Sequence, residues 1–376
     1  MTTNPTFTVT EEQQMLRSSA RQVLEARGGS ERVRELMMTD EAVDEAAYKE
    51  LAQMGLVGLL VPEEYGGSGS TFVEAGIVLE ELGRALLPVP YLSSAVLATT
   101  AILAGGSDDQ KAAYLPGIAS GEQRATLAHL NETGRLDADP GVAATSSDSG
   151  FELSGTAGYV LDGLTADTLV VAATTDGGIE LFVVPADTDG VRREKLDVLD
   201  LTRPMATVHL DGVSVDGDAK LSGAAGTEAL HRALTAGLVA IASEQSGASR
   251  YVHEDVTEFA RTRMQFGRAI GSFQAIKHRI ADLMVELESS TSAVMHAQRA
   301  LAAEDTDEIA IAAPMAKAYA SETFEHIAGE AIQIYGGIGF TWEHDAHLYF
   351  KRSKASRLLL GSPHQHRRVL ADVLGL

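Results

Sequence analysis

The stretch TLVVAATTDGGIELFVVP at residues 168–185 decides the fold that we expect for this chain. Two runs of β-branched and apolar residues, 168–173 and 179–185, flank a Thr-Asp-Gly-Gly turn, which is the pattern of two strands joined by a tight connection. Further short runs of this kind recur between residues 122 and 221, separated by Ser, Asp and Gly. The spacing predicts a small antiparallel barrel or sandwich of about 100 residues.

Helical patterns lie on both sides of this β-rich segment. Thr10 stands where an N-cap is expected, and apolar residues follow it at three- and four-residue spacing. After the strands, long apolar stripes again follow helical periodicity. We therefore expect an α+β multidomain fold with an N-terminal all-α domain at residues 1–121, a middle β-domain at 122–225 and a C-terminal four-helix bundle at 226–376.

Charge and composition exclude several classes of function. The chain has 30 Lys and Arg against 53 Asp and Glu, and its formal net charge of −23 disfavours nucleic acid and anionic membranes as partners. The absence of cysteine excludes disulfides, thiolate metal sites and a cysteine nucleophile, and we expect no metal site. Residues 85–106 carry no charge, but Pro88 and Pro90 interrupt them, which favours a buried helix over a membrane span. No signal-peptide pattern opens the chain, so we expect a cytoplasmic protein.

Four passages in the chain resemble one flavoprotein family. They are VPEEYGG at 61–67, RTRMQFG at 261–267, SFQAIKH at 272–278 and QIYGGIGF at 333–340. In this order and on this layout they resemble the acyl-CoA dehydrogenase family over essentially the whole chain. The resemblance is to the actinobacterial branch that includes subunits of heteromeric steroid side-chain enzymes. It implies FAD as cofactor, α,β-dehydrogenation of an acyl-CoA thioester, and an electron-transfer flavoprotein as the electron acceptor.

The resemblance implies cofactor contacts at the end of one long helix and the start of the next. It places Arg263 against the pyrophosphate of FAD, a role that suits a bidentate guanidinium. Phe266 is implied to contact the flavin dinucleotide, and Gln274 to face its adenine side. The alternatives are a helix-terminal arginine that answers the helix dipole, a phenylalanine that seals a helix corner and an ordinary exposed amide.

A second group of cofactor contacts is implied at the Gly-Gly segment. Gly336 and Gly337 leave the backbone open to a cofactor, while the Gln333 amide reaches the adenosine half. The alternative is a glycine-terminated helix end with nothing bound. In the family the cofactor lies between subunits, so this half-site reaches into a neighbour's flavin. Ser362 is carried over as a further contact from the family's threonine.

The chain departs from the family where the catalytic base belongs. The family holds a glutamate at one of two positions, and the matching residues here are Leu360 and Gly237, neither of which can accept a proton. The flavin-facing loop reads Asn-Glu-Thr-Gly at 131–134, and Tyr159 replaces the tryptophan that backs the flavin ring, although tyrosine can still stack there.

Several assemblies agree with this pattern. One is a base-lacking subunit of an α2β2 enzyme whose homologous partner carries the glutamate. Another is a self-sufficient homotetramer with a displaced base, for which Glu244 is the candidate, two helical turns after Gly237; the alternative for Glu244 is a solvated or subunit-contact glutamate. A flavin oxidase or monooxygenase and a non-catalytic scaffold on the same fold are further alternatives. The acyl group of the substrate is not encoded in any of these motifs.

Overall fold

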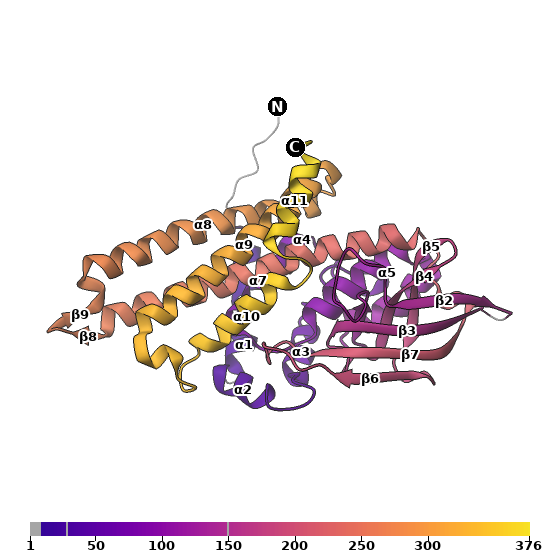
Figure 1. The fold of residues 1–376 in the computed structure, drawn as a ribbon, viewed down its shortest axis with the longest axis horizontal. Helices are drawn as coiled ribbons and strands as arrows, with labels where there is room; N and C mark the ends of the chain where they lie inside the picture. Colours follow the sequence, from indigo (N-terminus) through magenta and orange to yellow (C-terminus); the bar gives the residue numbers. More distant parts are fainter. Residues whose placement is uncertain (1–8, 28, 149) are drawn as a thin grey trace.

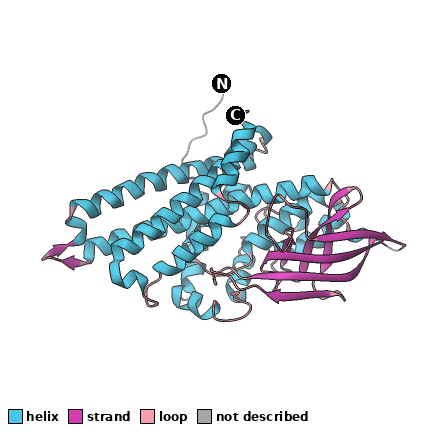
Figure 2. Cartoon of the chain, viewed as in Figure 1, coloured by secondary structure: helices cyan, strands magenta, loops and turns pink. Residues whose placement is uncertain are grey.

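A computed structural model describes residues 9–27, 29–148 and 150–376 of the chain. Helices make up both ends of the chain and a sheet lies between them in sequence, so the predicted α+β layout is confirmed (Figures 1 and 2). The sheet occupies one end of an elongated molecule and the C-terminal helices occupy the other (Figure 1). The boundaries after residues 121 and 225 stay predictions.

The N-terminal part is helical and has its own capping signals. The Thr10 hydroxyl accepts a hydrogen bond from the Gln13 amide, and the Gln13 side chain accepts one from the Thr10 amide, which is the capping box that starts α1. The stretch 85–106 holds η2, a π-helical turn after Pro90, and then α5, both largely buried. In the described part of the chain, no helix is long and apolar enough to cross a membrane. The N-terminal elements are α1 (Glu11–Ala26), α2 (Gly29–Leu36), α3 (Glu45–Gln53), η1 (Glu63–Tyr65), α4 (Phe72–Ala85), η2 (Tyr91–Ala98), α5 (Thr99–Gly105) and α6 (Asp108–Ala119).

The middle of the chain forms one sheet of mixed direction. The expected hairpin at residues 168–185 is the antiparallel pair β4–β5, in which Leu169 lies opposite Val184. β1, however, pairs with β4 in parallel, and the order β1-β4-β2-β3-β7-β6 leaves the sheet open over the described residues. The expectation of a purely antiparallel barrel or sandwich was wrong in this respect, because a parallel pair joins strands far apart in sequence and leaves no local pattern. The strands are β1 (Ala125–Ala128), β2 (Val142–Ser147), β3 (Gly150–Leu161), β4 (Thr168–Thr175), β5 (Gly178–Pro185), β6 (Val191–Lys195) and β7 (Met205–Asp216), and the short helix η3 (Gly217–Ala219) follows.

The sheet packs into two separate cores. On β4, Val170 and Ala172 face the core shared with the helices, whereas Leu169 and Val171 face the core on the other side of the sheet. Because both faces of β4 are buried, the strand is a continuous apolar run without polar alternation.

Long helices build the C-terminal part. α7 runs from the sheet to the far end of the molecule, α8 returns from that end, and α9 runs toward it again (Figure 1). The elements are α7 (Gly226–Thr262), β8 (Met264–Gln265), β9 (Arg268–Ala269), η4 (Ile270–Ser272), α8 (Gln274–Ala302), α9 (Thr306–Tyr335), η5 (Gly336–Phe340), α10 (Ala346–Leu358) and α11 (Pro363–Val373).

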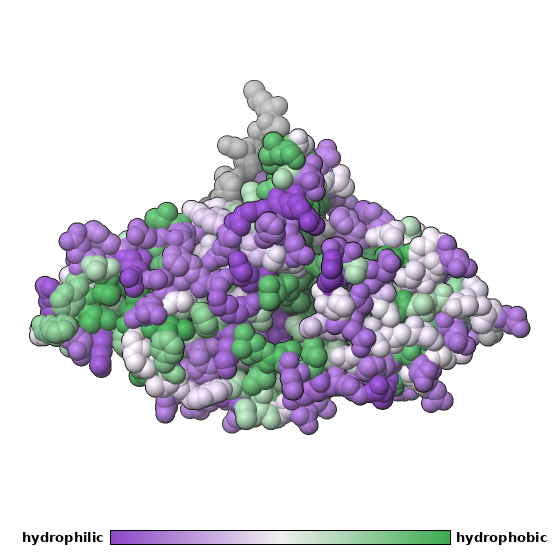
Figure 3. Space-filling model, in the orientation of Figure 1, coloured by the Kyte–Doolittle hydropathy of each residue, from purple (hydrophilic) through white to green (hydrophobic). Residues whose placement is uncertain are grey.

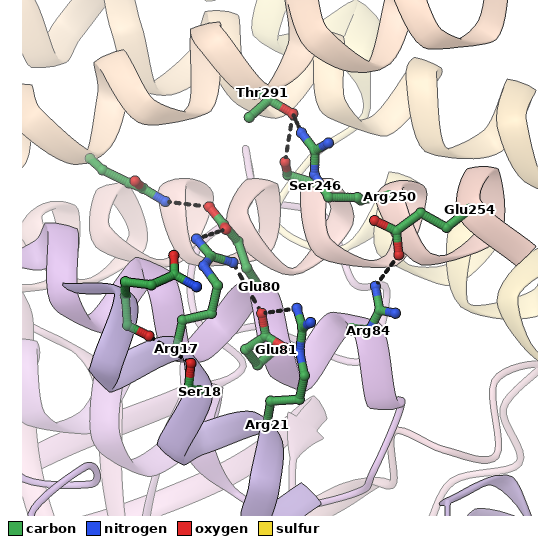
Figure 4. A network of polar contacts seen from close by, with 12 residues as sticks. Arg17, Ser18, Arg21, Glu80, Glu81, Arg84, Ser246, Arg250, Glu254 and Thr291 are labelled. Carbon is green, nitrogen blue, oxygen red and sulfur yellow. Dashed lines mark hydrogen bonds and ion pairs between the residues drawn. The ribbon is translucent and has the colours of Figure 1, made fainter. Parts of the chain in front are cut away.

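Ion pairs join α1 to α4, and an exposed pair joins α4 to this bundle (Figure 4). Arg17 on α1 donates to Glu80 at 2.7 Å and to Glu81 at 3.0 Å, both on α4. Arg21 donates to the same Glu81 at 2.8 Å, and Arg84 at the end of α4 reaches Glu254 on α7. The chain therefore folds around α7, which contacts α4, α8 and α9.

Candidate functional site

Six residues that the sequence singled out lie together at the end of the bundle farthest from the sheet. α7 ends, α8 begins and α9 ends at this position, so motifs far apart in the sequence meet there (Figure 1). All six side chains or glycine backbones are exposed, namely Arg263, Phe266, Gln274, Gln333, Gly336 and Gly337. We call this surface the bundle end. Apolar surface is visible there in Figure 3, where β8 and β9 lie.

The bundle end is held in shape by contacts beneath it. The Phe259 ring meets the Tyr335 ring edge to face at 5.0 Å, and the Tyr335 hydroxyl donates to Asp255 at 2.5 Å. These contacts tie the last turns of α7 and α9 together. Above them, Phe266 takes a left-handed backbone conformation at the β8–β9 turn and has an exposed fraction of 91%. A large aromatic ring held this far in solvent is suited to contact another molecule.

The side chains and the Gly-Gly segment of the bundle end are open to an anionic cofactor. A Cβ on Gly336 or Gly337 would have no atom within 4 Å. Among the described residues, the Arg263 guanidinium has no hydrogen-bond or ion-pair partner. Gly336, with φ of +68°, also caps α9, so the alternative of a glycine-terminated helix end describes the same residue without excluding cofactor contact. The residues present fit the pyrophosphate and adenosine half of FAD.

The two positions at which the family holds its base meet in space. Leu360 lies in the loop between α10 and α11, and Gly237 lies in the first half of α7. A Cβ on Gly237 would lie 2.6 Å from Leu360 Cδ1 and 2.6 Å from Leu97 Cδ2. Leu360 has an exposed fraction of 4%. We call Leu97, Gly237 and Leu360 the base locus. The two leucine side chains occupy the space next to Gly237.

Ser362 has a structural partner. Its hydroxyl caps α11 by accepting from the Gln365 amide, and the Gln365 side chain accepts from the Ser362 amide at 2.9 Å. This is a capping box, so the serine starts a helix, and its contact with a cofactor stays a prediction.

Glu244 lies away from the base locus and is paired. Its carboxylate accepts a hydrogen bond from Arg203, and both side chains are buried. Leu82, Asp162, Arg203 and Glu244 line a cavity of about 30 Å³, which has room for about two water molecules and not for an acyl group. Burial raises the pKa of Asp162 to about 6. The role of Glu244 as a displaced base stays a prediction, and the geometry gives it the role of an interdomain ion pair.

The loop at 131–134, which the resemblance places beside the flavin, makes its own hydrogen bonds, and Tyr159 next to it has an exposed fraction of 40%. The Asn131 carboxamide accepts from the Thr133 amide at 3.0 Å and donates to the Asp139 carbonyl at 3.0 Å. The Tyr159 ring packs so closely on Gly134 that a Cβ there would lie 2.7 Å from it. The Tyr159 ring contacts the loop at 131–134. Its stacking on a flavin stays a prediction.

The sequence reasoning missed the buried charges that join the domains. Arg352 on α10 donates to Asp200 at 2.5 Å and to Thr202 at 2.6 Å, and Arg203 in the same loop reaches α7. Lys317, on α9, is also fully buried. The available signal was a single charge within an otherwise small and apolar helical run, AAPMAKAYA at 312–320.

Comparison with known proteins identifies the class. The family model described as acyl-CoA dehydrogenase, C-terminal domain, matches residues 224–375, and the one described as acyl-CoA dehydrogenase, N-terminal domain, matches residues 10–122. The chain belongs to the acyl-CoA dehydrogenase family, whose members are oxidoreductases that act on CH–CH bonds. The predicted family is thereby confirmed.

Several relatives in this family are similar to the chain over nearly its whole length. Acyl-CoA dehydrogenase IpdE2 of Mycobacterium tuberculosis is 35% identical over 365 residues, covering 97% of this chain and 98% of its own. Among solved structures, the ChsE4-ChsE5 complex of M. tuberculosis is similar with 30% identity, a TM-score of 0.90 and 98% of both chains covered. A variant of the Tcur3481-Tcur3483 steroid ACAD shows 32% identity and a TM-score of 0.87, with 98% of this chain and 99% of that chain covered.

Proposed function

We propose that this chain is the base-lacking subunit of a heteromeric, FAD-dependent acyl-CoA dehydrogenase. A homologous partner would hold the flavin ring, the acyl-CoA and the glutamate base, in an α2β2 assembly. The bundle end of this chain would hold the pyrophosphate and adenosine of the partner's FAD. The bound FAD would accept the electrons of the α,β-dehydrogenation and release them to an electron-transfer flavoprotein.

The filled base locus is the observation that carries this proposal. A base must reach the α-carbon of a thioester, and the family supplies it from either of two positions. Here these two positions are Leu360 and Gly237, and they pack against each other. Neither position carries a carboxylate, and a side chain at Gly237 would meet Leu360 and Leu97 at 2.6 Å.

The opposite states of the two cofactor-facing regions support the same proposal. The bundle end presents Arg263 and Phe266 to solvent, ready for a molecule outside this chain. The loop at 131–134 binds its own backbone and the Tyr159 ring. A subunit that serves its neighbour's cofactor needs the first region and not the second.

The displaced-base alternative has less support from the geometry. Glu244 would have to release Arg203, leaving a buried guanidinium without its carboxylate. It also lies two helical turns along α7 from the base locus. The names of the similar structures, ChsE4-ChsE5 and Tcur3481-Tcur3483, each join two chains, which agrees with a heteromeric assembly.

The test compares flavin content and turnover with and without a partner. The chain is purified alone and after co-expression with a homologous chain that has glutamate at the position matching Leu360 or Gly237. We expect acyl-CoA-dependent flavin reduction only in the co-expressed assembly. Turnover by this chain alone would refute the base-lacking assignment.

The cofactor contact is tested in the same assembly. Arg263→Ala is expected to weaken FAD binding by about 10- to 100-fold, because it removes a charge-assisted contact to phosphate of about 1.5–3 kcal/mol. Arg261→Ala is the matched control, since Arg261 is exposed and pairs with Glu258 on its own helix. Equal flavin occupancy in the two variants would remove the Arg263 assignment.

A further inference from the structure

Lys317 is a fully buried amine in the C-terminal bundle. It lies on α9 with an exposed fraction of 0%. Burying an ammonium group is costly unless polar atoms replace its water. Burial, with the Arg357 guanidinium as the second cause, lowers the pKa of Lys317 to about 7. A residue retained at this cost calls for a structural or functional reason.

The hydrogen-bond partners of Lys317 connect α9 to the end of α10 and to the loop that follows it. Its Nζ donates to Ser321 Oγ at 3.0 Å, to the Gly361 carbonyl at 3.1 Å and to the Arg357 carbonyl at 3.3 Å. These three acceptors match the three N–H groups of an ammonium. Two of them belong to the end of α10 and to the loop of residues 359–362, which carries Leu360.

His366 holds the same loop from the other side. Its Nε2 lies 3.0 Å from the Leu360 carbonyl, and because a carbonyl only accepts, Nε2 carries the hydrogen. Burial first, and then Lys317, lowers the pKa of His366 to about 4, so the imidazole is neutral near pH 7. Lys317 and His366 thus bind adjacent carbonyls of the 359–362 loop.

The loop needs such support because its backbone conformation is unfavourable. Leu360 has φ of +55°, a region that costs a residue with a side chain about 1–2 kcal/mol. Gly361 has φ of +105°, and a Cβ there would lie 2.8 Å from His366 Nε2. This conformation turns the Leu360 side chain inward, onto Gly237 and Leu97.

We infer that Lys317 and His366 are positioning residues that clamp Leu360 into the base locus and keep this chain's own acyl site shut. The inference rests on the proposed function, because that proposal identifies the base locus as the place where an acyl thioester would react. The clamp commits the chain to serving the site of its partner. It also explains why a buried lysine faces carbonyl groups.

The absence of cysteine in the chain allows a direct test. Leu360→Cys places a unique thiol at the base locus, and its reaction with N-ethylmaleimide reports how often the loop opens. The rate is divided by that of the same chain in denaturant. Leu358→Cys, at a position with an exposed fraction of 66%, gives the rate for an open thiol of the same region.

In the Leu360→Cys background, Lys317→Met is expected to raise the labelling rate at least tenfold. Ser321→Ala is the matched control, because it removes a partner of Lys317 on α9 and leaves its bonds to the Arg357 and Gly361 carbonyls, and we expect a change below twofold. His366→Leu is expected to accelerate labelling as well. His366→Gln, whose side-chain amide can donate to the same carbonyl, is expected to restore the slow rate.

Slow labelling in folded Lys317→Met and His366→Leu would overturn the clamp. So would fast labelling in the His366→Gln variant, since a general loss of packing and not the hydrogen bond would then open the loop. If Lys317→Met does not fold, the His366 pair decides alone. The measurement uses this chain without flavin or partner, so its failure is distinct from failure of the heteromer experiment.

Discussion

The bundle end and the base locus differ in solvent exposure and in packing. At the bundle end, Arg263 and Phe266 project into solvent, and no atom of the described residues lies within 4 Å of a Cβ position on Gly336 or Gly337. At the base locus, Leu360 and Leu97 fill the space beside Gly237 to within 2.6 Å of a Cβ position. One region is exposed to solvent, and the other is packed as part of the protein core.

This difference separates two requirements that a self-sufficient enzyme must meet together. Binding a cofactor across an interface needs exposed, correctly placed groups, and catalysis needs a carboxylate at a reachable position. A subunit that has to meet only the first requirement can pack its second site as core, because filling a cavity with hydrocarbon stabilises the fold. The two regions should therefore respond in opposite ways to substitution.

The largest effect is expected at the buried ion pair. Glu244→Ala leaves Arg203 buried without its carboxylate, which should lower the free energy of unfolding by about 3–5 kcal/mol. Glu254→Ala is the control, since Glu254 is half exposed in its pair with Arg84 and should cost under about 1 kcal/mol. Urea unfolding of both variants makes the comparison. Equal losses would show that Glu244 is not structural.

Truncation of Leu360 should cost slightly less stability. Leu360→Ala removes a buried side chain and leaves a cavity beside Gly237, so we expect a loss of about 2–4 kcal/mol in urea unfolding. Leu358→Ala, two residues earlier and exposed, should change stability by less than about 0.5 kcal/mol. A small loss at Leu360 would mean that the base locus is loosely packed and open to a ligand.

Asp162 should give a pH-dependent effect. Its pKa is raised from 3.8 to about 6, so the folded state holds a proton that the unfolded state releases between these values. Stability contributed by this group is present below pH 4 and is lost as the pH rises through 6, by up to about 3 kcal/mol.

Asp162→Asn removes this titration. The variant should therefore gain stability relative to the unchanged chain as the pH rises from 4 to 7, as measured by urea unfolding at each pH. Asp187→Asn, at an exposed position, is the control and should leave the pH profile unchanged. Parallel profiles for Asp162→Asn and the unchanged chain would contradict the raised pKa.

The smallest effect on stability is expected at the bundle end. Phe266→Ala should alter the free energy of unfolding by less than about 0.5 kcal/mol, because the ring is almost fully exposed. In the assembly with a glutamate-bearing partner, the same variant should bind FAD about threefold to tenfold more weakly, as expected for loss of an aromatic contact of about 0.5–1.5 kcal/mol. A large loss of stability in the isolated chain would instead make Phe266 a folding residue.

The local patterns of the chain predicted much of this structure. The β4–β5 hairpin, the Thr10 capping box and the long C-terminal helices follow from neighbours within a few residues of one another. The bundle-end residues could also be identified from the sequence, because short motifs mark the ends of α7 and α9 and the start of α8. Their roles toward FAD stay predictions.

Contacts between residues that are far apart in the sequence could not be predicted from these local patterns. The parallel pairing of β1 with β4, the Arg203–Glu244 ion pair and the clamp of Lys317 on the 359–362 loop each join separate segments. No local period records which distant side chain will fill a space. Leu360 and Gly237 were each named as positions without a base, but their contact was not foreseen.

The sequence by itself determined the helix–sheet–helix layout, the family and the absence of glutamate at both base positions. Only the tertiary structure decided that these two positions touch, that hydrocarbon fills the space between them and that buried polar groups hold the loop in place. The physical reason is that secondary structure and motifs depend on neighbours along the chain, whereas packing depends on residues that the fold brings together from far apart.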